Sequence, residues 1–226
     1  MKKYAIIVAG GSGSRMGSGI PKQFRSLCGR PVLWWSLKAF HEASPETEII
    51  LVLPAKFKRL WEEIFSTLLP EERYPHKITI GGATRTESVR NGLKLVGEED
   101  SIVAVHDGAR PLIKETTISE GWKMAAEKGA AIPVVPVVDS LREMEKDGSH
   151  CVDRSSYVAV QTPQVFRRKL LFDAYEAAGD KIFSDDAAVV EAFGAQIALY
   201  PGNPENMKVT NPGDIDIATV LLKRDV

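Results

Sequence analysis

The chain has 226 residues, of which 44% are hydrophobic and 26% charged, and 29 lysines and arginines nearly balance 30 aspartates and glutamates. These values are typical of one soluble globular domain and exclude a disordered chain, a collagen-like repeat and a disulfide-rich mini-protein. A net charge of −1 also argues against a protein that coats nucleic acid, whose binding surface would be strongly basic.

Strand and helix signals alternate along most of the chain. Residues 4–9 form a continuous apolar run, which is typical of a parallel strand buried on both faces, and a glycine-rich loop follows at residues 10–19. Thr84 and Glu87 match a capping box, which predicts the start of a helix. The remaining patterns predict strands over 48–53, 77–80, 101–106, 130–138 and 196–200, and helices over 31–41, 57–69, 84–96, 116–128, 167–178, 185–193 and from 213 onward. We expect a Rossmann-like α/β fold with a mostly parallel central sheet flanked by helices, in a single domain over residues 1–226.

The alternation breaks at residues 139–160. This segment is more polar than the strands around it, and it contains two short runs on either side of an Asp147-Gly148 pair, which predicts a β-hairpin. We expect the segment to project from the core as a dimerisation arm that contacts a partner subunit.

The chain lacks the signals of secretion, membrane insertion and metal binding by cysteine. Cys28 and Cys151 are too isolated for a disulfide framework or a zinc site, and no apolar run reaches the roughly 18 residues that span a bilayer. The first apolar run is too short for a signal peptide. We expect a cytoplasmic protein with no membrane and no nucleic acid among its partners.

The first 41 residues carry seven lysines and arginines and no acidic residue. On charge alone, a solvated surface explains this run as well as an anion site does. The segment also holds the glycine-rich loop, whose backbone N–H groups can approach phosphate oxygens closely, and Arg15 and Lys22 follow at short range. Met16 stands where a dinucleotide-binding motif needs its third glycine, and the Gly-Lys-Ser/Thr of a Walker A motif is absent. The loop therefore predicts a phosphate site of another kind.

Six motifs together resemble one family. The loop and the Pro21-Lys22-Gln23 that follows it resemble the signature of sugar-phosphate nucleotidyltransferases. In their order and spacing the six motifs resemble the 2-C-methyl-D-erythritol 4-phosphate cytidylyltransferases over residues 4–222, and ribitol-5-phosphate cytidylyltransferases share much of the pattern. The other five motifs are Gly81-Gly82 with Arg85 and Glu87-Ser88-Val89, His106-Asp107-Gly108-Ala109-Arg110-Pro111, Val152-Asp153-Arg154, Gln161-Thr162-Pro163-Gln164 and Asn206-Met207-Lys208-Val209-Thr210.

The resemblance implies that a sugar phosphate attacks the α-phosphorus of CTP and that pyrophosphate leaves, in non-mevalonate isoprenoid biosynthesis. The attacking phosphate is already an anion, so this chemistry needs positioning and charge neutralisation rather than a strong base. By resemblance, Arg15 and Lys22 are the catalytic cations, CTP is the co-substrate, and Mg²⁺ or another divalent cation assists.

The resemblance also implies two sets of binding residues. Gly81, Gly82 and Ser88 match the region that reads cytosine. Asp107 ends a buried strand, where open α/β sheets bind ligands, so it is the candidate metal ligand as well, although a turn aspartate would explain it too. The full set on the nucleotide side is Ala9, Gly10, Gly11, Gly13, Gly81, Gly82, Ser88, Asp107 and Gly108.

On the side of the sugar phosphate, the resemblance implies that Arg154 comes from the arm of the other subunit, so that the active site requires a homodimer. By itself Arg154 would be an ordinary exposed arginine, and Lys208 precedes a helix-start signal and could be structural. The full set on this side is Arg110, Ser140, Arg154, Thr162 and Lys208.

Three other functions remain as alternatives. A ribitol-5-phosphate cytidylyltransferase would use the same chemistry on another sugar phosphate. A nicotinamide-dependent oxidoreductase would need the third glycine that Met16 replaces. A non-catalytic nucleotide-binding module would bind CTP and release no pyrophosphate.

Overall fold

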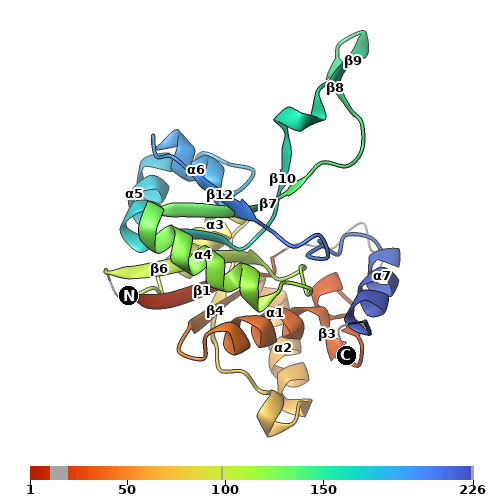
Figure 1. The fold of residues 1–226 in the computed structure, drawn as a ribbon. Helices are drawn as coiled ribbons and strands as arrows, with labels where there is room; N and C mark the ends of the chain where they lie inside the picture. Colours follow the sequence, from red (N-terminus) through yellow and green to blue (C-terminus); the bar gives the residue numbers. More distant parts are fainter. Residues whose placement is uncertain (11–19, 98, 225–226) are drawn as a thin grey trace.

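The computed structural model describes residues 1–10, 20–97 and 99–224, and it has one large sheet at its centre (Figure 1). In the described residues eight strands form this sheet in the order β10-β7-β11-β6-β1-β4-β5, with β12 beside β7. Only β10 and β11 run antiparallel to their neighbours, so the expected mostly parallel α/β sheet is confirmed. The strands are β1 (Lys2–Val8), β4 (Glu48–Leu53), β5 (Lys77–Ile80), β6 (Ser101–Asp107), β7 (Ala130–Pro136), β10 (Val158–Val160), β11 (Gln164–Arg167) and β12 (Ala198–Pro201).

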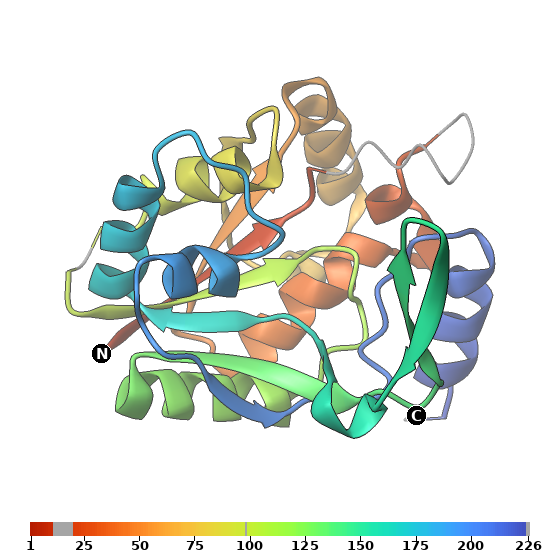
Figure 2. The ribbon, with the colours of Figure 1, turned by 90° about the horizontal axis from the view of Figure 1, so that it is seen from above.

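Helices cover both faces of the sheet, and Figure 2 shows α4 on the opposite side of the strands from α3 and α5. Successive side chains of β1 point to opposite faces of the sheet, so this strand contributes to the hydrophobic core on each face. Ala5 and Ile7 pack with α1, α2 and α4, whereas Tyr4 and Ile6 pack with α3, α5 and α6. The helices are α1 (Val32–Ala43), α2 (Ala55–Thr67), α3 (Arg85–Leu93), α4 (Glu115–Lys128), α5 (Arg168–Ala178), α6 (Asp186–Ala192) and α7 (Gly213–Leu222).

Smaller elements connect the large ones. A short hairpin of β2 (Ser26–Leu27) and β3 (Arg30–Pro31) leads into α1, and Leu27 packs with residues of α7 in a third, separate core. The described residues include the 3₁₀ turns η2 (Lys22–Phe24), η3 (Pro70–Glu72) and η4 (Arg154–Ser156). No helix in the described part of the chain is long and apolar enough to cross a membrane.

The sequence patterns did not predict β10 and β11. Both strands pair antiparallel with β7, and β11 also pairs with β6, where Gln164 lies opposite Val105. Residues 161–163 interrupt the two strands. This interruption brings Thr162 to the carboxyl end of β6.

The segment expected to form an arm contains a two-stranded hairpin of β8 (Leu141–Glu145) and β9 (Gly148–Val152), which projects away from the body (Figure 1). Glu145 pairs with Gly148, so the loop consists of Lys146 and Asp147, and the predicted Asp147-Gly148 turn was wrong by one residue. The end of the expected arm, β10, lies in the central sheet. The projecting part is therefore shorter than residues 139–160.

Three loops meet where the parallel strands end. The backbone N–H of Ala9, after β1, donates to the carbonyl of Val52 in β4 at 2.9 Å. The N–H of Gly81, after β5, donates to Leu53 at 2.8 Å, and the N–H of Gly108, after β6, donates to Val8 at 2.9 Å. The residues that follow three parallel strands therefore share one edge of the sheet, where such sheets bind ligands.

Candidate active site

Ser88 joins two of the glycine segments at this edge. Its hydroxyl accepts a hydrogen bond from the N–H of Gly82 at 3.0 Å and donates to the carbonyl of Thr84 at 2.8 Å. A Cβ added at Gly81 would lie 2.8 Å from this hydroxyl oxygen, and a Cβ at Gly10 would lie 3.6 Å from it. Gly10, Gly81, Gly82 and Ser88 therefore lie together, with exposed backbone that a side chain would cover.

Thr84 starts α3 as the sequence predicted, because its hydroxyl accepts the N–H of Glu87 at 3.1 Å. The carboxylate of Glu87 accepts the N–H of Ala83 at 2.7 Å rather than that of Thr84, so the capping box is shifted by one residue. The loop before α3 is consequently held at both Gly82 and Ala83.

The start of the glycine-rich loop is also fixed. The carbonyl of Ala9 accepts a hydrogen bond from the buried side chain of Gln23 at 2.8 Å, and a Cβ at Gly108 would lie 3.3 Å from the Cβ of Ala9. The other candidates on this loop are outside the described residues. They are Gly11, Gly13 and Arg15.

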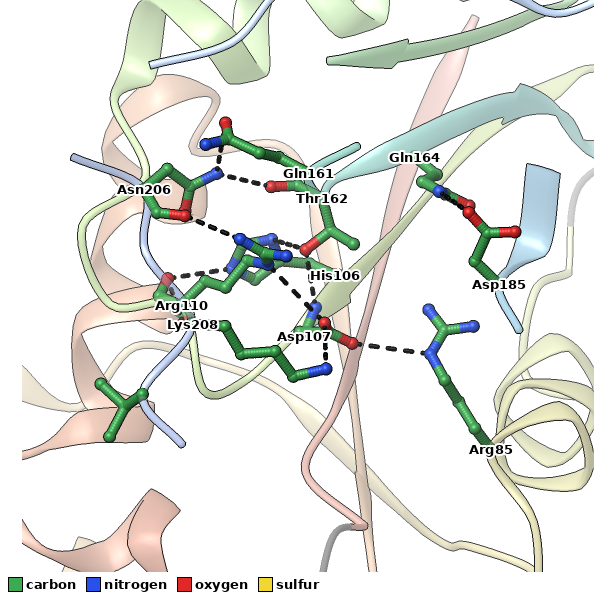
Figure 3. A network of polar contacts seen from close by, with 12 residues as sticks. Arg85, His106, Asp107, Arg110, Gln161, Thr162, Gln164, Asp185, Asn206 and Lys208 are labelled. Carbon is green, nitrogen blue, oxygen red and sulfur yellow. Dashed lines mark hydrogen bonds and ion pairs between the residues drawn. The ribbon is translucent and has the colours of Figure 1, made fainter. Parts of the chain in front are cut away.

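Asp107, the last residue of β6, is surrounded by three cations from different segments (Figure 3). The Nζ atom of Lys208 lies 2.8 Å from Oδ2, the Nε atom of Arg110 lies 3.7 Å from Oδ2, and the Nε atom of Arg85 lies 3.5 Å from Oδ1. Burial by itself would raise the pKa of Asp107, but the charges of these cations outweigh it and hold the pKa well below its usual range. Asp107 is therefore a carboxylate at neutral pH, and it orients three cations.

Arg85 is a site residue that the sequence analysis named in a motif but did not assign to the site. Its Nη2 atom donates to the carboxylate of Asp186 at 2.7 Å, and the Tyr175 hydroxyl donates to the same carboxylate at 2.6 Å. Asp186 is fully buried. Burial acts to lower the pKa of Arg85, and the charges of Asp186 and Asp107 reverse this and raise it. Arg85 thus links α3, α6 and β6.

The network extends to β11 through Gln164, which was quoted only as part of a motif. Its Oε1 atom accepts the backbone N–H groups of Asp186 at 3.0 Å and Ala187 at 2.8 Å, and its Nε2 atom donates to Asp185 at 2.7 Å (Figure 3). Asp185 also accepts the N–H of Ala188 at 3.0 Å, so it caps the start of α6. Hydrogen-bonded polar groups of β11 and α6 therefore surround the ion pair between Arg85 and Asp186.

Thr162 lies against the end of β6. Its Oγ1 atom accepts the backbone N–H of Asp107 at 3.0 Å and lies 3.1 Å from Nδ1 of His106, whose Nε2 atom lies 3.2 Å from the carbonyl oxygen of Arg110. Burial lowers the pKa of His106 from 6.5 to about 4. The His106 ring is therefore neutral at physiological pH.

The segment before α7 is tied to the same turn. The side chain of Asn206 donates to the carbonyl of Thr162 at 2.8 Å, and its backbone carbonyl accepts from Nη1 of Arg110 at 2.8 Å. Lys22 reaches this segment too, because its Nζ atom donates to the carbonyl of Val209 at 2.8 Å. Lys22, Arg110 and Lys208 are thereby brought to one place from three parts of the chain.

Two candidates lie away from this cluster. Ser140 and Arg154 are exposed residues at the two ends of the hairpin segment, and Arg154 donates to the carbonyl of Val138. Arg154 also lines a cavity of about 570 Å³ beside β7, β10 and β12, with Tyr157 and Leu199 among its neighbours. Within one chain the structure does not place either residue at Asp107.

The surroundings of Asp107 do not fit a metal ion held by protein side chains. One carboxylate with three cations around it leaves a dication no complete ligand set, and the described residues contain no group of three His, Cys, Asp or Glu that could hold one. The excess of positive charge fits phosphate groups instead, which arginine and lysine bind well.

Comparisons with known proteins agree with this chemistry. The sequence model of the family described as 2-C-methyl-D-erythritol 4-phosphate cytidylyltransferase matches residues 4–224. A Phocaeicola vulgatus protein of that name is 45% identical over 222 residues, which cover 98% of this chain and 100% of the relative. The crystal structure of the protein of that name from Thermus thermophilus superposes with a TM-score of 0.80 at 32% identity, and covers 99% of this chain and 100% of that one. A 4-diphosphocytidyl-2C-methyl-D-erythritol synthase from Anaerococcus prevotii superposes with a TM-score of 0.83 at 27% identity, over 99% and 96% of the two chains.

Proposed function

The chain belongs to the family of 2-C-methyl-D-erythritol 4-phosphate cytidylyltransferases, and from this premise we propose the reaction that its site performs. The enzyme joins CTP and 2-C-methyl-D-erythritol 4-phosphate, and the products are 4-diphosphocytidyl-2-C-methyl-D-erythritol and pyrophosphate. The reaction serves non-mevalonate isoprenoid biosynthesis. The observation that carries the proposal is the cluster of Arg85, Arg110 and Lys208 around one buried carboxylate, Asp107, beside the glycines after β1 and β5. Lys22 joins it through the carbonyl of Val209, the residue after Lys208.

The glycine side of the site would take the nucleotide. Gly10, Gly81 and Gly82 are partly exposed and carry no side chains of their own, so a flat base can approach their backbone close to the Ser88 hydroxyl. The hydroxyl of Ser88 aligns the N–H of Gly82 and retains one lone pair. We infer that the cytosine is read here, and that Gly11, Gly13 and Arg15 continue the site along the triphosphate.

The cation side would take the sugar phosphate. One phosphate oxygen of methylerythritol phosphate attacks the α-phosphorus of CTP, and the bond from that phosphorus to the bridging oxygen of pyrophosphate breaks. Lys22 and Arg15 neutralise the charge that gathers around the α-phosphorus, while Arg110 and Lys208 hold the attacking phosphate. Asp107 keeps Lys208 and Arg110 aimed at one point and takes no proton itself.

A divalent cation is part of the proposal only as the partner of CTP. Magnesium is commonly held by substrate phosphates with few protein ligands, and Asp107 already faces three cations. We therefore expect Mg²⁺ to enter with the nucleotide, and no protein step depends on it. The assignment of Asp107 as a metal ligand stays a prediction.

The hairpin arm would complete the site of a second subunit. Arg154 and Ser140 lie at the foot of an exposed hairpin and not in the Asp107 cluster of their own chain. We infer a homodimer in which each arm contributes Arg154 to the phosphate site of its partner. We also propose a cytoplasmic location, since the two cysteines are unpaired and exposed.

A pyrophosphate assay tests the proposal. The enzyme is incubated with CTP and Mg²⁺ and with methylerythritol phosphate or ribitol 5-phosphate, and pyrophosphate release is followed for each. We expect faster turnover with methylerythritol phosphate. Faster turnover with ribitol 5-phosphate would favour the ribitol enzyme, and CTP binding without any pyrophosphate would indicate a non-catalytic module.

A further inference from the structure

We propose that His106 is a positioning residue for the sugar-phosphate side of the site, and that it makes Thr162 a hydrogen-bond acceptor toward a hydroxyl group of the substrate (Figure 3). The inference rests on the proposed function and adds the direction of a hydrogen bond. It also assigns a role to a fully buried side chain that takes no direct part in the reaction.

The polar contacts of His106 lead to two segments that carry site residues. Its Nδ1 atom lies 3.1 Å from Oγ1 of Thr162, and its Nε2 atom lies 3.2 Å from the carbonyl oxygen of Arg110. The ring packs edge-on against Phe40, with centroids 5.4 Å apart, so it cannot swing away from these partners. His106 therefore braces the 161–163 loop against the turn after β6.

The direction of each hydrogen bond in this chain follows from the groups present. The carbonyl of Arg110 can only accept, so Nε2 of His106 carries a proton. A second proton on Nδ1 would place a charge on a fully buried ring, and burial disfavours this charge more than the neighbouring Asp107 carboxylate favours it. Nδ1 is therefore an acceptor, and the hydroxyl of Thr162 donates to it.

The hydroxyl of Thr162 can then make one further hydrogen bond. Its proton goes to His106, and one of its lone pairs accepts the backbone N–H of Asp107 at 3.0 Å. Among the described residues these are the partners of Oγ1, so its second lone pair remains, and it can accept but not donate. Phosphate oxygens are acceptors as well, so Thr162 would bind a hydroxyl of the sugar alcohol and leave the phosphate to Arg110 and Lys208.

A second histidine supplies an internal comparison. Nε2 of the half-buried His76 accepts from Nε1 of Trp61 at 2.9 Å, and its Nδ1 atom lies 2.9 Å from the carbonyl of Tyr74. The same reasoning gives His76 the opposite tautomer, with the proton on Nδ1. In the part of the chain that the structure describes, His76 contacts Trp61, Tyr74 and Phe65, and none of these is assigned to the site.

Nitrogen-15 NMR of the histidine-labelled enzyme at neutral pH tests the tautomers directly. We expect one histidine protonated at Nε2 whose Nδ1 signal moves in Thr162→Val and returns in Thr162→Ser, and another, His76, protonated at Nδ1. A proton on Nδ1 of His106 would overturn the proposal. This readout needs no activity and no variant of His106.

Kinetics test the consequence for the substrate. The Nε2 atom of His106→Gln can still donate to the carbonyl of Arg110, but its amide oxygen does not occupy the place of Nδ1 beside Thr162. We expect the KM for the sugar phosphate to rise roughly tenfold, as for loss of a buried hydrogen-bond partner, with little change in the KM for CTP. His76→Gln is the matched control and should leave both KM values as they are.

Two outcomes would contradict the inference. An unchanged sugar-phosphate KM in a folded His106→Gln would show that the brace does not act on that substrate. An equal rise in both KM values would indicate a general structural loss. A wild-type enzyme that releases no pyrophosphate would instead refute the proposed function, so the two failures are distinguishable.

Discussion

The Nζ atom of Lys208 lies 2.8 Å from Oδ2 of Asp107 and joins the irregular segment before α7 to the carboxyl end of β6. Arg110 and Arg85 reach the same carboxylate, at 3.7 and 3.5 Å. One buried anion therefore holds three cations at fixed angles, and this preorganisation lets the site receive a phosphate without first rearranging its charges.

Replacing Asp107 with asparagine should remove this organising charge. The amide is of similar size but cannot attract three cations, so Lys208 and Arg110 lose their common direction. We expect kcat/KM to fall by about 10² or more, as when preorganised charge is lost from an active site. Steady-state pyrophosphate release measures the loss. The proposed role would be wrong if kcat/KM in a folded Asp107→Asn matched the wild type.

Lys22→Ala should act mainly on kcat. The ammonium donates to the carbonyl of Val209 and lies beside the cation cluster, where charge develops on the α-phosphate. We expect kcat to fall about 10²-fold with an unchanged circular dichroism spectrum. Lys169→Ala is the control, because this exposed lysine pairs with Asp173 at 2.8 Å, and it should leave kcat unchanged. Equal kcat values for the two variants would remove Lys22 from the catalytic machinery.

Much of the fold could be predicted from local patterns. Glu48–Leu53 and Lys77–Ile80 match the predicted strands residue for residue, since β-branched and aliphatic residues bounded by Pro54 and by Gly81-Gly82 mark strands well. Val158–Val160 was missed because it lies in the segment assigned to the arm. The pairing of Val158–Val160 and Gln164–Arg167 with β7 is set by tertiary contacts, which local patterns do not show.

The site, like the fold, could be predicted only in part from the sequence. Asp107 could be singled out from the sequence because it ends a buried strand, and Lys208 and Thr162 because their motifs resemble a family. The ion pair between Arg85 and Asp186 could not be predicted, because each residue opens a helix in the sequence and nothing local identifies its partner. Hydrogen-bond direction at His106 likewise depends on neighbours that only the folded chain supplies.

Mixing two inactive variants tests the role of the arm. If Arg154 acts in the partner's site and Lys208 in its own, a dimer of Arg154→Ala with Lys208→Ala keeps one intact site. Random exchange makes about half of the dimers mixed, so activity should recover to roughly a quarter of wild type. Each variant incubated alone is the control. A mixture no more active than its components would place Arg154 outside the partner's site.

Gly81→Ala should weaken nucleotide binding. The added Cβ would lie 2.8 Å from Oγ of Ser88, so the hydroxyl must move and release the N–H of Gly82. We expect the KM for CTP to rise roughly tenfold while the KM for the sugar phosphate stays the same. Gly148→Ala, where nothing lies within 4 Å of an added Cβ, is the matched control. A rise confined to the sugar-phosphate KM would contradict the assignment of this loop to the base.

Acid should destabilise the fold partly through His106. Its pKa is lowered from 6.5 to about 4 because the folded protein buries the ring, so the unfolded chain binds the proton more tightly. Stability from this group is fully present above pH 6.5 and is lost as the pH falls from 6.5 toward 4, by about 2 kcal/mol at pH 5. Urea unfolding gives the free energy of unfolding at pH 8 and at pH 5. The difference between the two values should be smaller by about 2 kcal/mol in His106→Gln than in the wild type. His76→Gln should retain the His106 contribution, and an equal pH dependence in wild type and His106→Gln would show that the ring is not held neutral by the fold.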